Sequence, residues 1–366
     1  MWGKSEQQAF LALVRAGLFP IREEGNPEIR IDGTTDWNVV YQLAQEQSVQ
    51  GVVLQGIETV QGLWLKAHGS SLVPQMLLLQ WIGNVQVIEQ RNKAMNQFVA
   101  DLVAKMREAD IYAILVKGQG VAQCYEKPLW RPSGDVDLLL SEDNYAKAKE
   151  FMLPMSSSRK REEQYSKHWG MSIGEWYVEI HGSLRSGLSE RVDVVIDAVQ
   201  RDVFYRGNVR TWENGKTQVF LPGVDDDVFF VFTHFIKHFY KEKLGLRQVC
   251  DWIRLLWTYR SEIDVKLLER RLSRAGLMSE WRGFACLAVD FLGMPADAMP
   301  FYEVRRKKDE VRGKKLIKFI LRGYSGNKIK DTLAIARIFT RNTMKFLPGI
   351  LFHLNRLKIK ERLNYC

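Results

Sequence analysis

The sequence predicts an α+β fold, in which a small mixed sheet is flanked along the chain by helical parts. Short β-branched or leucine-rich runs bounded by turn residues are confined to residues 111–222. Before and after them, apolar residues recur at helical spacing instead. These observations divide the chain into a helical N-terminal part (1–110), an α/β core (111–222), a second helical part (223–300) and a basic helical tail (301–366).

The N-terminal part contains two helical patterns. One begins at a Thr/Asp cap before Trp37 and continues through Val40 and Leu43. The other covers residues 74–109 and begins with Pro74, a residue suited to the first turn of a helix. Both patterns predict helices before the sheet begins.

Strands and helices alternate in the predicted core. In chain order we expect a strand at 111–116 that ends at Lys117-Gly118, a short helix at 118–125, a strand at 135–140, a helix capped by Ser141, two paired strands joined between Gly170 and Gly174, and a hairpin around Asn214-Gly215. After Pro222 the helical pattern returns and continues to about Leu292, with aromatic residues at core positions.

Two acids interrupt the strand "DVDLLL". Asp135 and Asp137 are two residues apart, so their side chains point to one face, while Val136 and Leu138 point to the other. Two like charges side by side repel, which a divalent cation would compensate. We expect Asp137→Asn to leave the fold intact because it relieves this repulsion. The alternative is a solvated strand end without any ligand.

A third acid lies in "EWYVEIHGSL". Glu179 and His181 share one face of this predicted strand, and Val178 and Ile180 share the other. Three carboxylates are about what two metal ions require. The alternatives are that Glu179 is an exposed strand residue and that His181 is a hydrogen-bonded structural histidine rather than a group that orients a substrate.

Lys117-Gly118 lies where a strand is expected to become a helix. Glycine allows a backbone to approach a phosphate closely, a helix N-terminus favours an anion, and the lysine adds a positive charge. Four segments carry a resemblance to a known family: "VKGQG", "RPSGDVDLLL", "VEIHGSL" and "LPGVDDDVFFVFTHFIKHFYKEKLGLRQVCDW". Through them the chain resembles the uncharacterised nucleotidyltransferase family of bacteria, within the polymerase-β-like superfamily. The resemblance covers residues 37–256, and Gln119 stands where the superfamily usually has Ser or Gly.

The resemblance implies a nucleotidyltransferase core and a set of site residues. The substrate would be a nucleoside triphosphate such as ATP, bound with Mg²⁺ or Mn²⁺, as two ions. The metal ligands and catalytic residues would be Asp135, Asp137 and Glu179. The nucleotide-binding residues would be Lys117, Gly118, Gln119, Arg131, Gly134 and Arg247.

Other polar residues near this pattern have competing interpretations. Arg131 pairs with a triphosphate, neutralises the acids or is an exposed loop residue. Arg247 either reaches the nucleotide or forms a helix salt bridge with Asp251, four residues on. His234 and His238 share a helix face, but the sequence lacks the further ligands of a zinc site. The resemblance implies that the helical part 223–300 lines the active cleft, which would place both histidines on the substrate side.

Charge and composition bear on location and partners. Residues 301–366 contain 18 Lys+Arg and 5 Asp+Glu, a net charge of +13, whereas the remainder carries −3. The tail is expected to bind an anionic membrane surface or nucleic acid, or to be a docking helix with a solvated basic face, and its apolar residues Phe346, Leu347, Ile350, Leu351 and Phe352 bear on that choice. The four scattered cysteines, and the lack of a transmembrane or signal-peptide pattern, predict a cytoplasmic protein, either free or peripheral at the membrane.

We therefore expect an enzyme that transfers a nucleoside monophosphate from a nucleoside triphosphate to an acceptor that the sequence does not name. Two alternatives stand beside it. One is a glycosyltransferase in which Asp-x-Asp holds a nucleotide sugar through a metal ion. The other is a non-catalytic nucleotide-binding regulatory protein.

Overall fold

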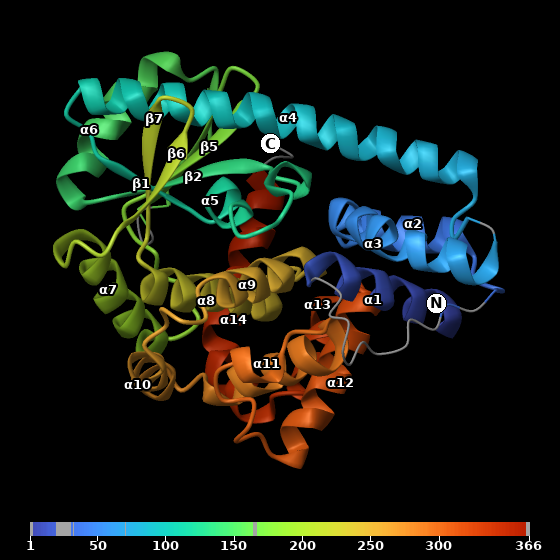
Figure 1. Cartoon of the computed structure of the whole chain (residues 1–366). Coiled ribbons are helices and arrows are strands. Elements are labelled where there is room, and N and C mark those ends of the chain that lie inside the picture. Colours follow the sequence, from blue (N-terminus) through green and yellow to red (C-terminus); the bar gives the residue numbers. More distant parts are fainter. Residues whose placement is uncertain (1–2, 20–30, 32, 70, 164–166, 364–366) are drawn as a thin grey trace.

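A mixed β-sheet and a larger group of helices make up the computed structural model, which describes residues 3–19, 31, 33–69, 71–163 and 167–363 (Figure 1). The α+β fold expected from the sequence is confirmed. Seven strands form one sheet in the order β3-β4-β5-β2-β1-β7-β6. They are β1 (Ala113–Val116), β2 (Asp135–Leu140), β3 (Ser158–Arg159), β4 (His168–Ile173), β5 (Trp176–His181), β6 (Arg210–Asn214) and β7 (Thr217–Leu221).

The sheet is mixed because two of its pairings are parallel. β2 pairs in parallel with β5, and β1 with β7. The other neighbours are antiparallel, including β4–β5 and the β6–β7 hairpin, whose predicted turn lies at Asn214-Gly215. The expected strands of the core are therefore present, and β3 is an additional edge strand.

Side chains on the two faces of the sheet enter different cores. Leu115 and Leu138 face a cluster that the C-terminal half of α4 (Gln75–Glu108) and α6 (Glu142–Met152) cover. Val116 and Leu139, one residue along each strand, belong to the main core of the helical part. Because side chains alternate along a strand, Asp135 and Asp137 lie on the face of Leu139, toward the helices.

The N-terminal part is helical, as expected. Its helices are α1 (Lys4–Leu18), α2 (Trp37–Glu46), α3 (Gln50–His68) and α4, which runs along the sheet and past the shorter helices (Figure 1). Asp36 caps α2 through a hydrogen bond from the Asn38 amide, and Pro74 immediately precedes α4. Within the core, Ser141 caps α6, and α5 (Gly118–Ala122) is the short helix after β1. α7 (Glu190–Tyr205) was not predicted.

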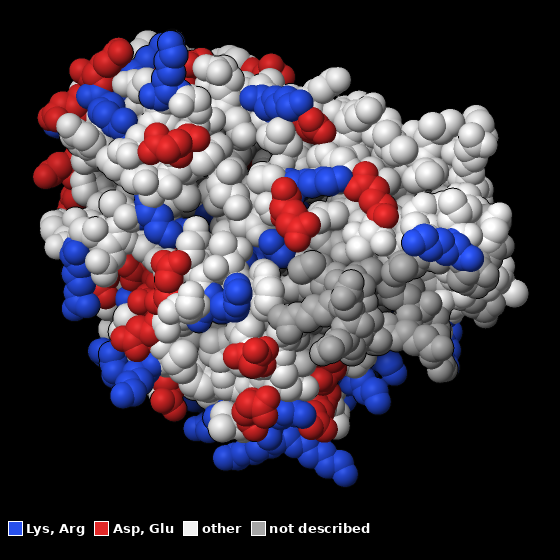
Figure 2. Space-filling view, in the orientation of Figure 1, with Lys and Arg blue, Asp and Glu red and all other residues white. Residues whose placement is uncertain are grey.

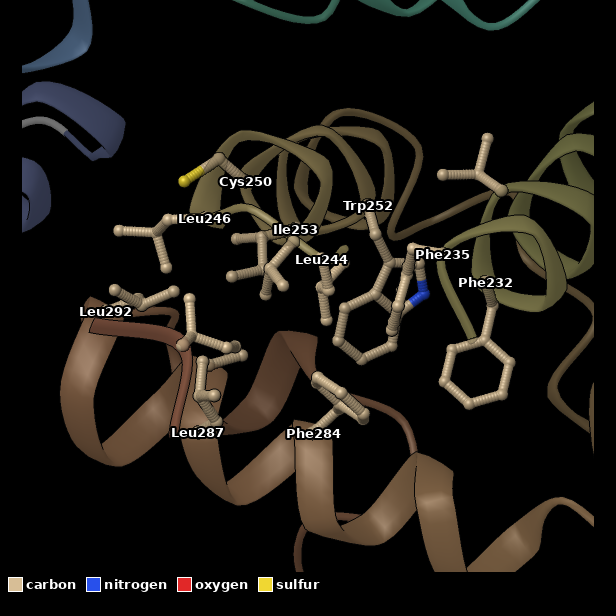
Figure 3. Close-up of a cluster of buried hydrophobic side chains, with 14 of the residues drawn as sticks. Phe232, Phe235, Leu244, Leu246, Cys250, Trp252, Ile253, Phe284, Leu287 and Leu292 are labelled. Carbon is tan, nitrogen blue, oxygen red and sulfur yellow. The ribbon is translucent and has the colours of Figure 1, made fainter. Parts of the chain in front are cut away.

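The helical part after the sheet packs around aromatic side chains. It contains α8 (Val224–Lys241), α9 (Leu246–Thr258), α10 (Val265–Ala275) and α11 (Met278–Leu292). Phe235 of α8 packs against Trp252 of α9 and Phe284 of α11, with ring centroids 5.5 and 4.9 Å apart (Figure 3). The aromatic residues of α8 and α9 are core residues, as the sequence predicts. This rigid core fixes α8 and α9 opposite the acidic face of the sheet.

The last part of the chain continues the same helical body. It forms α12 (Lys307–Arg322), α13 (Lys328–Ala336) and α14 (Thr340–Leu363), and α12 packs closely on α11. Phe346 and Ile350 are buried in the main core, so they are not available for the membrane alternative, which required them. Lys and Arg side chains project along the lower edge of the molecule in Figure 2. Among the described residues, no helix is long and apolar enough to cross a bilayer.

Candidate metal and nucleotide site

Three carboxylates from two adjacent strands converge on the helix-facing side of the sheet. The parallel register places Asp137 of β2 beside Glu179 of β5, and Asp135 beside Tyr177. Ligand oxygens of Asp135, Asp137 and Glu179 all lie within 4.8 Å of one another. Val136 and Ile180 alternate with these acids and are buried on the other face. They hold both strands in this register, because a slip of one residue would turn the acids into the apolar core that α4 and α6 cover.

Lys117 and Gly118 form a turn directly beside the acids. Both have positive φ angles, 59° and 41°. This turn brings the Lys117 ammonium to 2.8 Å from Asp137 Oδ1. A Cβ atom on Gly118 would lie 3.6 Å from the Asp135 carbonyl oxygen, so there is room for a side chain, and the positive φ is what favours glycine. The predicted phosphate turn is thus adjacent to the predicted metal ligands.

Burial and neighbouring charges separate the pKa values of the two aspartates. Burial raises the pKa of Asp137, but Lys117 and a hydrogen bond from His181 outweigh it and hold the pKa well below the usual range. The charge of Asp137, followed by burial, raises the pKa of Asp135. Asp137 therefore has a cationic partner, Lys117, whose charge Asn would not balance. Asp137→Asn would relieve the repulsion with Asp135 but lose this ion pair, and the survival of the fold stays a prediction.

Two histidines complete the acidic face. His181 Nε2 donates to Asp137 Oδ1 at 2.8 Å, and His168 Nε2 lies 2.9 Å from Glu179 Oε2. Their rings stack with centroids 4.6 Å apart because the antiparallel β4–β5 register places the two residues side by side. Burial lowers the pKa of His168, but Glu163 and Glu179 raise it to about 9, whereas burial lowers the pKa of His181. His168 was not predicted as a site residue.

Arg131 is buried and forms an ion pair with Asp251 of α9. Its Nη2 and Nε atoms donate to the two carboxylate oxygens at 2.7 and 3.0 Å, and Tyr125 donates to the same carboxylate at 2.8 Å. The remaining nitrogen, Nη1, donates to the Pro132 carbonyl and the Ser133 hydroxyl. The alternative that Arg131 is an exposed loop residue is therefore wrong, and its pairing with a triphosphate stays a prediction.

Arg247 does not form the expected salt bridge with Asp251, because Arg131 occupies that carboxylate. Arg247 Nη1 donates instead to the Pro132 carbonyl at 2.6 Å. Asp137, burial, Lys117 and Glu179 have larger effects on the pKa of Asp135, but the Arg247 guanidinium also lowers it. Arg247 is thus near enough to Asp135 to act on its charge, in keeping with the nucleotide-side position predicted for it.

His234 and His238 lie together on α8. Their Nε2 atoms are 3.0 Å apart, and His238 Nδ1 lies 2.7 Å from Glu242 Oε2. Burial lowers the pKa of His234 strongly, and the charge of Lys117 lowers it further. His234 is therefore the end of this chain of groups that approaches the acids. Within the described residues the pair belongs to no group of three metal-ligating side chains.

The two remaining predicted residues differ in exposure. The Gln119 side chain is buried, and its amide nitrogen contacts Met95 of α4, so it points away from the acids. Gly134 precedes Asp135, and a Cβ atom there would meet no atom within 4 Å. Of the predicted nucleotide-binding residues, Lys117, Gly118, Gly134 and Arg247 adjoin the acidic face.

The fold and this site define an α+β protein with a carboxylate cluster suited to a hard metal ion. A family model described as uncharacterised nucleotidyltransferase matches residues 33–293. The chain therefore belongs to this nucleotidyltransferase family, and the match includes both the sheet and the helices α8–α11. No curated protein and no solved structure matches the chain.

Proposed function

We propose that this protein is a metal-dependent enzyme of the polymerase-β-like type, which transfers a nucleoside monophosphate from a nucleoside triphosphate to an acceptor. The observation that carries the proposal is the convergence of Asp135, Asp137 and Glu179 within 4.8 Å on one face of the sheet. Membership of a nucleotidyltransferase family supports the same reaction class.

The three carboxylates fit Mg²⁺ or Mn²⁺. Both ions prefer oxygen ligands, and a magnesium ion in a nucleotide site is bound by a few carboxylates together with phosphate oxygens. When bound, the metal supplies positive charge that stabilises the oxygens of the reacting phosphate. Asp135, Asp137 and Glu179 would hold it.

Lys117, Gly118, Gly134 and Arg247 are proposed to bind the nucleotide. Lys117 contacts Asp137 Oδ1, and its ammonium would leave this oxygen free when Asp137 holds a metal ion. The ammonium would stay beside the Gly118 turn, where it could pair with a phosphate. Arg131 has a positioning role instead, because its hydrogen bonds hold Pro132, Ser133 and α9 together.

The acceptor is proposed to bind on the side of the site that α8 forms. Glu242, His238 and His234 form a chain of contacts that ends near Lys117. The carboxylate of Glu242 orients the His238 ring, and His234 is the member placed to accept a proton from an acceptor group. His181 orients Asp137 rather than the substrate, since its Nε2 atom donates to that carboxylate.

The test combines metal binding with product formation. Mn²⁺ binding is measured by calorimetry in the presence of a non-hydrolysable nucleoside triphosphate, for the native protein and for Asp135→Asn. Asp143→Asn, which changes an exposed acid at the start of α6, is the matched control. We expect binding to be lost in Asp135→Asn alone; equal binding in all three proteins would refute the metal site.

Each α-labelled nucleoside triphosphate is then incubated with the protein, Mg²⁺ or Mn²⁺ and a cell lysate. A labelled acceptor together with released pyrophosphate is the expected result, and both should disappear in Asp135→Asn. Transfer of a sugar from a nucleotide sugar would instead identify a glycosyltransferase. Metal-dependent nucleotide binding without any turnover would identify a regulatory protein.

A further inference from the structure

The consecutive helices α13 and α14 each bury one side. Asp331 and Ile335 of α13 are buried, as are Phe346 and Ile350 of α14. Ile338 and Phe339, at the bend between the two helices, are buried as well. Within each helix the buried positions are four residues apart, so they lie on one side of it. The other side of each helix is exposed.

The exposed sides of both helices carry large apolar side chains. Ile329 and Leu333 are one turn apart on α13 and are 72% and 57% exposed. Met344 and Leu351 are two turns apart on α14 and are 65% and 50% exposed. Single exposed apolar residues are ordinary, but a pair on each of two consecutive helices is typical of an interaction surface.

The charges between these residues have one sign. Lys330, Arg337, Arg341 and Lys345 are exposed on the same two helices. The acid within this stretch, Asp331, is buried and accepts a hydrogen bond from the Ser325 amide at 2.9 Å. From residue 328 to residue 351, all of which the structure describes, no acidic side chain is exposed. We call the four apolar and four cationic residues the basic-apolar face.

We propose that the basic-apolar face docks on an anionic lipid bilayer. Apolar side chains enter the boundary between headgroups and acyl chains, while lysine and arginine remain at the level of the anionic headgroups. Charge complementarity favours this partner, because the face has four cations and residues 301–366 carry a net charge of +13. Nucleic acid fits less well, because exposed aliphatic side chains gain nothing from a phosphate backbone.

The experiment uses the full chain and sedimentation with sucrose-loaded vesicles. One vesicle type contains only phosphatidylcholine, and the other contains about one third phosphatidylglycerol in addition. Binding is expected only to the anionic vesicles and should weaken as salt is raised. Equal binding to both vesicle types, or none to either, would overturn the proposal.

Two paired variants separate the apolar from the ionic contribution. Leu333→Ser/Met344→Ser should lower the partition coefficient by about tenfold for each residue changed. Lys330→Glu/Lys345→Glu should lower it by at least about fivefold for each charge removed. All four positions are exposed, so melting temperatures should stay at the native value.

The matched controls make equivalent changes elsewhere on the surface. Met76→Ser/Leu79→Ser removes exposed apolar side chains from α4, and Lys216→Glu/Lys266→Glu reverses exposed charges outside the tail. Both controls should bind vesicles like the native protein. A labelled RNA is tested in parallel by fluorescence anisotropy. RNA binding that Leu333→Ser/Met344→Ser leaves unchanged, together with vesicle binding that the same variant does not weaken, would show a nucleic-acid surface instead.

Discussion

Replacing Asp251 with Asn tests whether Arg131 supports the site or binds the nucleotide. Asp251 accepts two hydrogen bonds from the Arg131 guanidinium and one from Tyr125. Only 6% of Asp251 and 5% of Arg131 is exposed. Asparagine keeps the shape and one oxygen acceptor but removes the charge, so the guanidinium would be buried without a counter-ion.

The expected loss of stability is large. Removing one partner from a buried ion pair costs about 3–5 kcal/mol, because the other charge stays buried and unpaired. Asparagine still accepts a hydrogen bond, which places the expected loss in the free energy of unfolding near the lower end, at about 3 kcal/mol. That is a substantial part of the ~5–15 kcal/mol that stabilises a typical domain.

Urea unfolding measures this loss, with Asp197→Asn as the control. Asp197 of α7 also accepts from an arginine, Arg185 Nε at 2.8 Å, but this pair is partly exposed and should contribute less than about 1 kcal/mol. The double variant Arg131→Met/Asp251→Leu should recover much of the loss. If Asp251→Asn costs no more than Asp197→Asn, Arg131 is not held by the ion pair and remains available as a nucleotide ligand.

Three further sets of variants test the Lys117-Gly118 turn, the charge of His168 and the burial of α14. Gly118→Ala should lower the free energy of unfolding by about 1–2 kcal/mol because φ is positive there, and Gly118→Asn should lower it less. Equal urea midpoints for the native protein and both variants would show that the turn relaxes. The pKa of His168 is raised from 6.5 to about 9 in the folded protein. Protonated His168 therefore contributes up to about 3 kcal/mol to the free energy of unfolding, fully below pH 6.5, and this contribution is lost as pH rises through 9. The difference in stability between native protein and His168→Gln should therefore shrink from pH 6 to pH 10, and a constant difference would contradict the charged pairing with Glu179. Phe346 is buried and Leu351 is exposed, so Phe346→Ser should lower the free energy of unfolding by about 3 kcal/mol or more and Leu351→Ser by less than about 1 kcal/mol. Equal losses in urea unfolding would contradict this burial.

The acids of the site could be predicted from the sequence because the signal is local. Alternation along "DVDLLL" assigns Asp135 and Asp137 to one face, and alternation along "WYVEIH" does the same for Glu179. The buried residues between them specify which face is solvated. The sequence did not show that the two strands are parallel neighbours. A slip of one residue in either strand, however, would have turned its acids into the apolar core.

Contacts between distant residues could not be predicted in this way. Arg131 and Asp251 are 120 residues apart, whereas Arg247 lies one helical turn from Asp251, so helical spacing favoured the wrong partner. His168 lay within a predicted strand, and its relation to His181 depends on the register of the β4–β5 pair. A search for histidines opposite each other across predicted paired strands would have found it.

The balance of charge around the three carboxylates separates stability from function. Asp137 pairs with Lys117 and His181, and Glu179 lies beside His168, so these two acids contribute to the fold as well as to a ligand site. Asp135 has no ion pair among the residues that the structure describes, and the neighbouring Asp137 charge raises its pKa. Its ionised carboxylate therefore costs stability. That cost is compensated only when a positive ligand binds, which makes Asp135 the residue whose replacement should remove metal binding without weakening the fold.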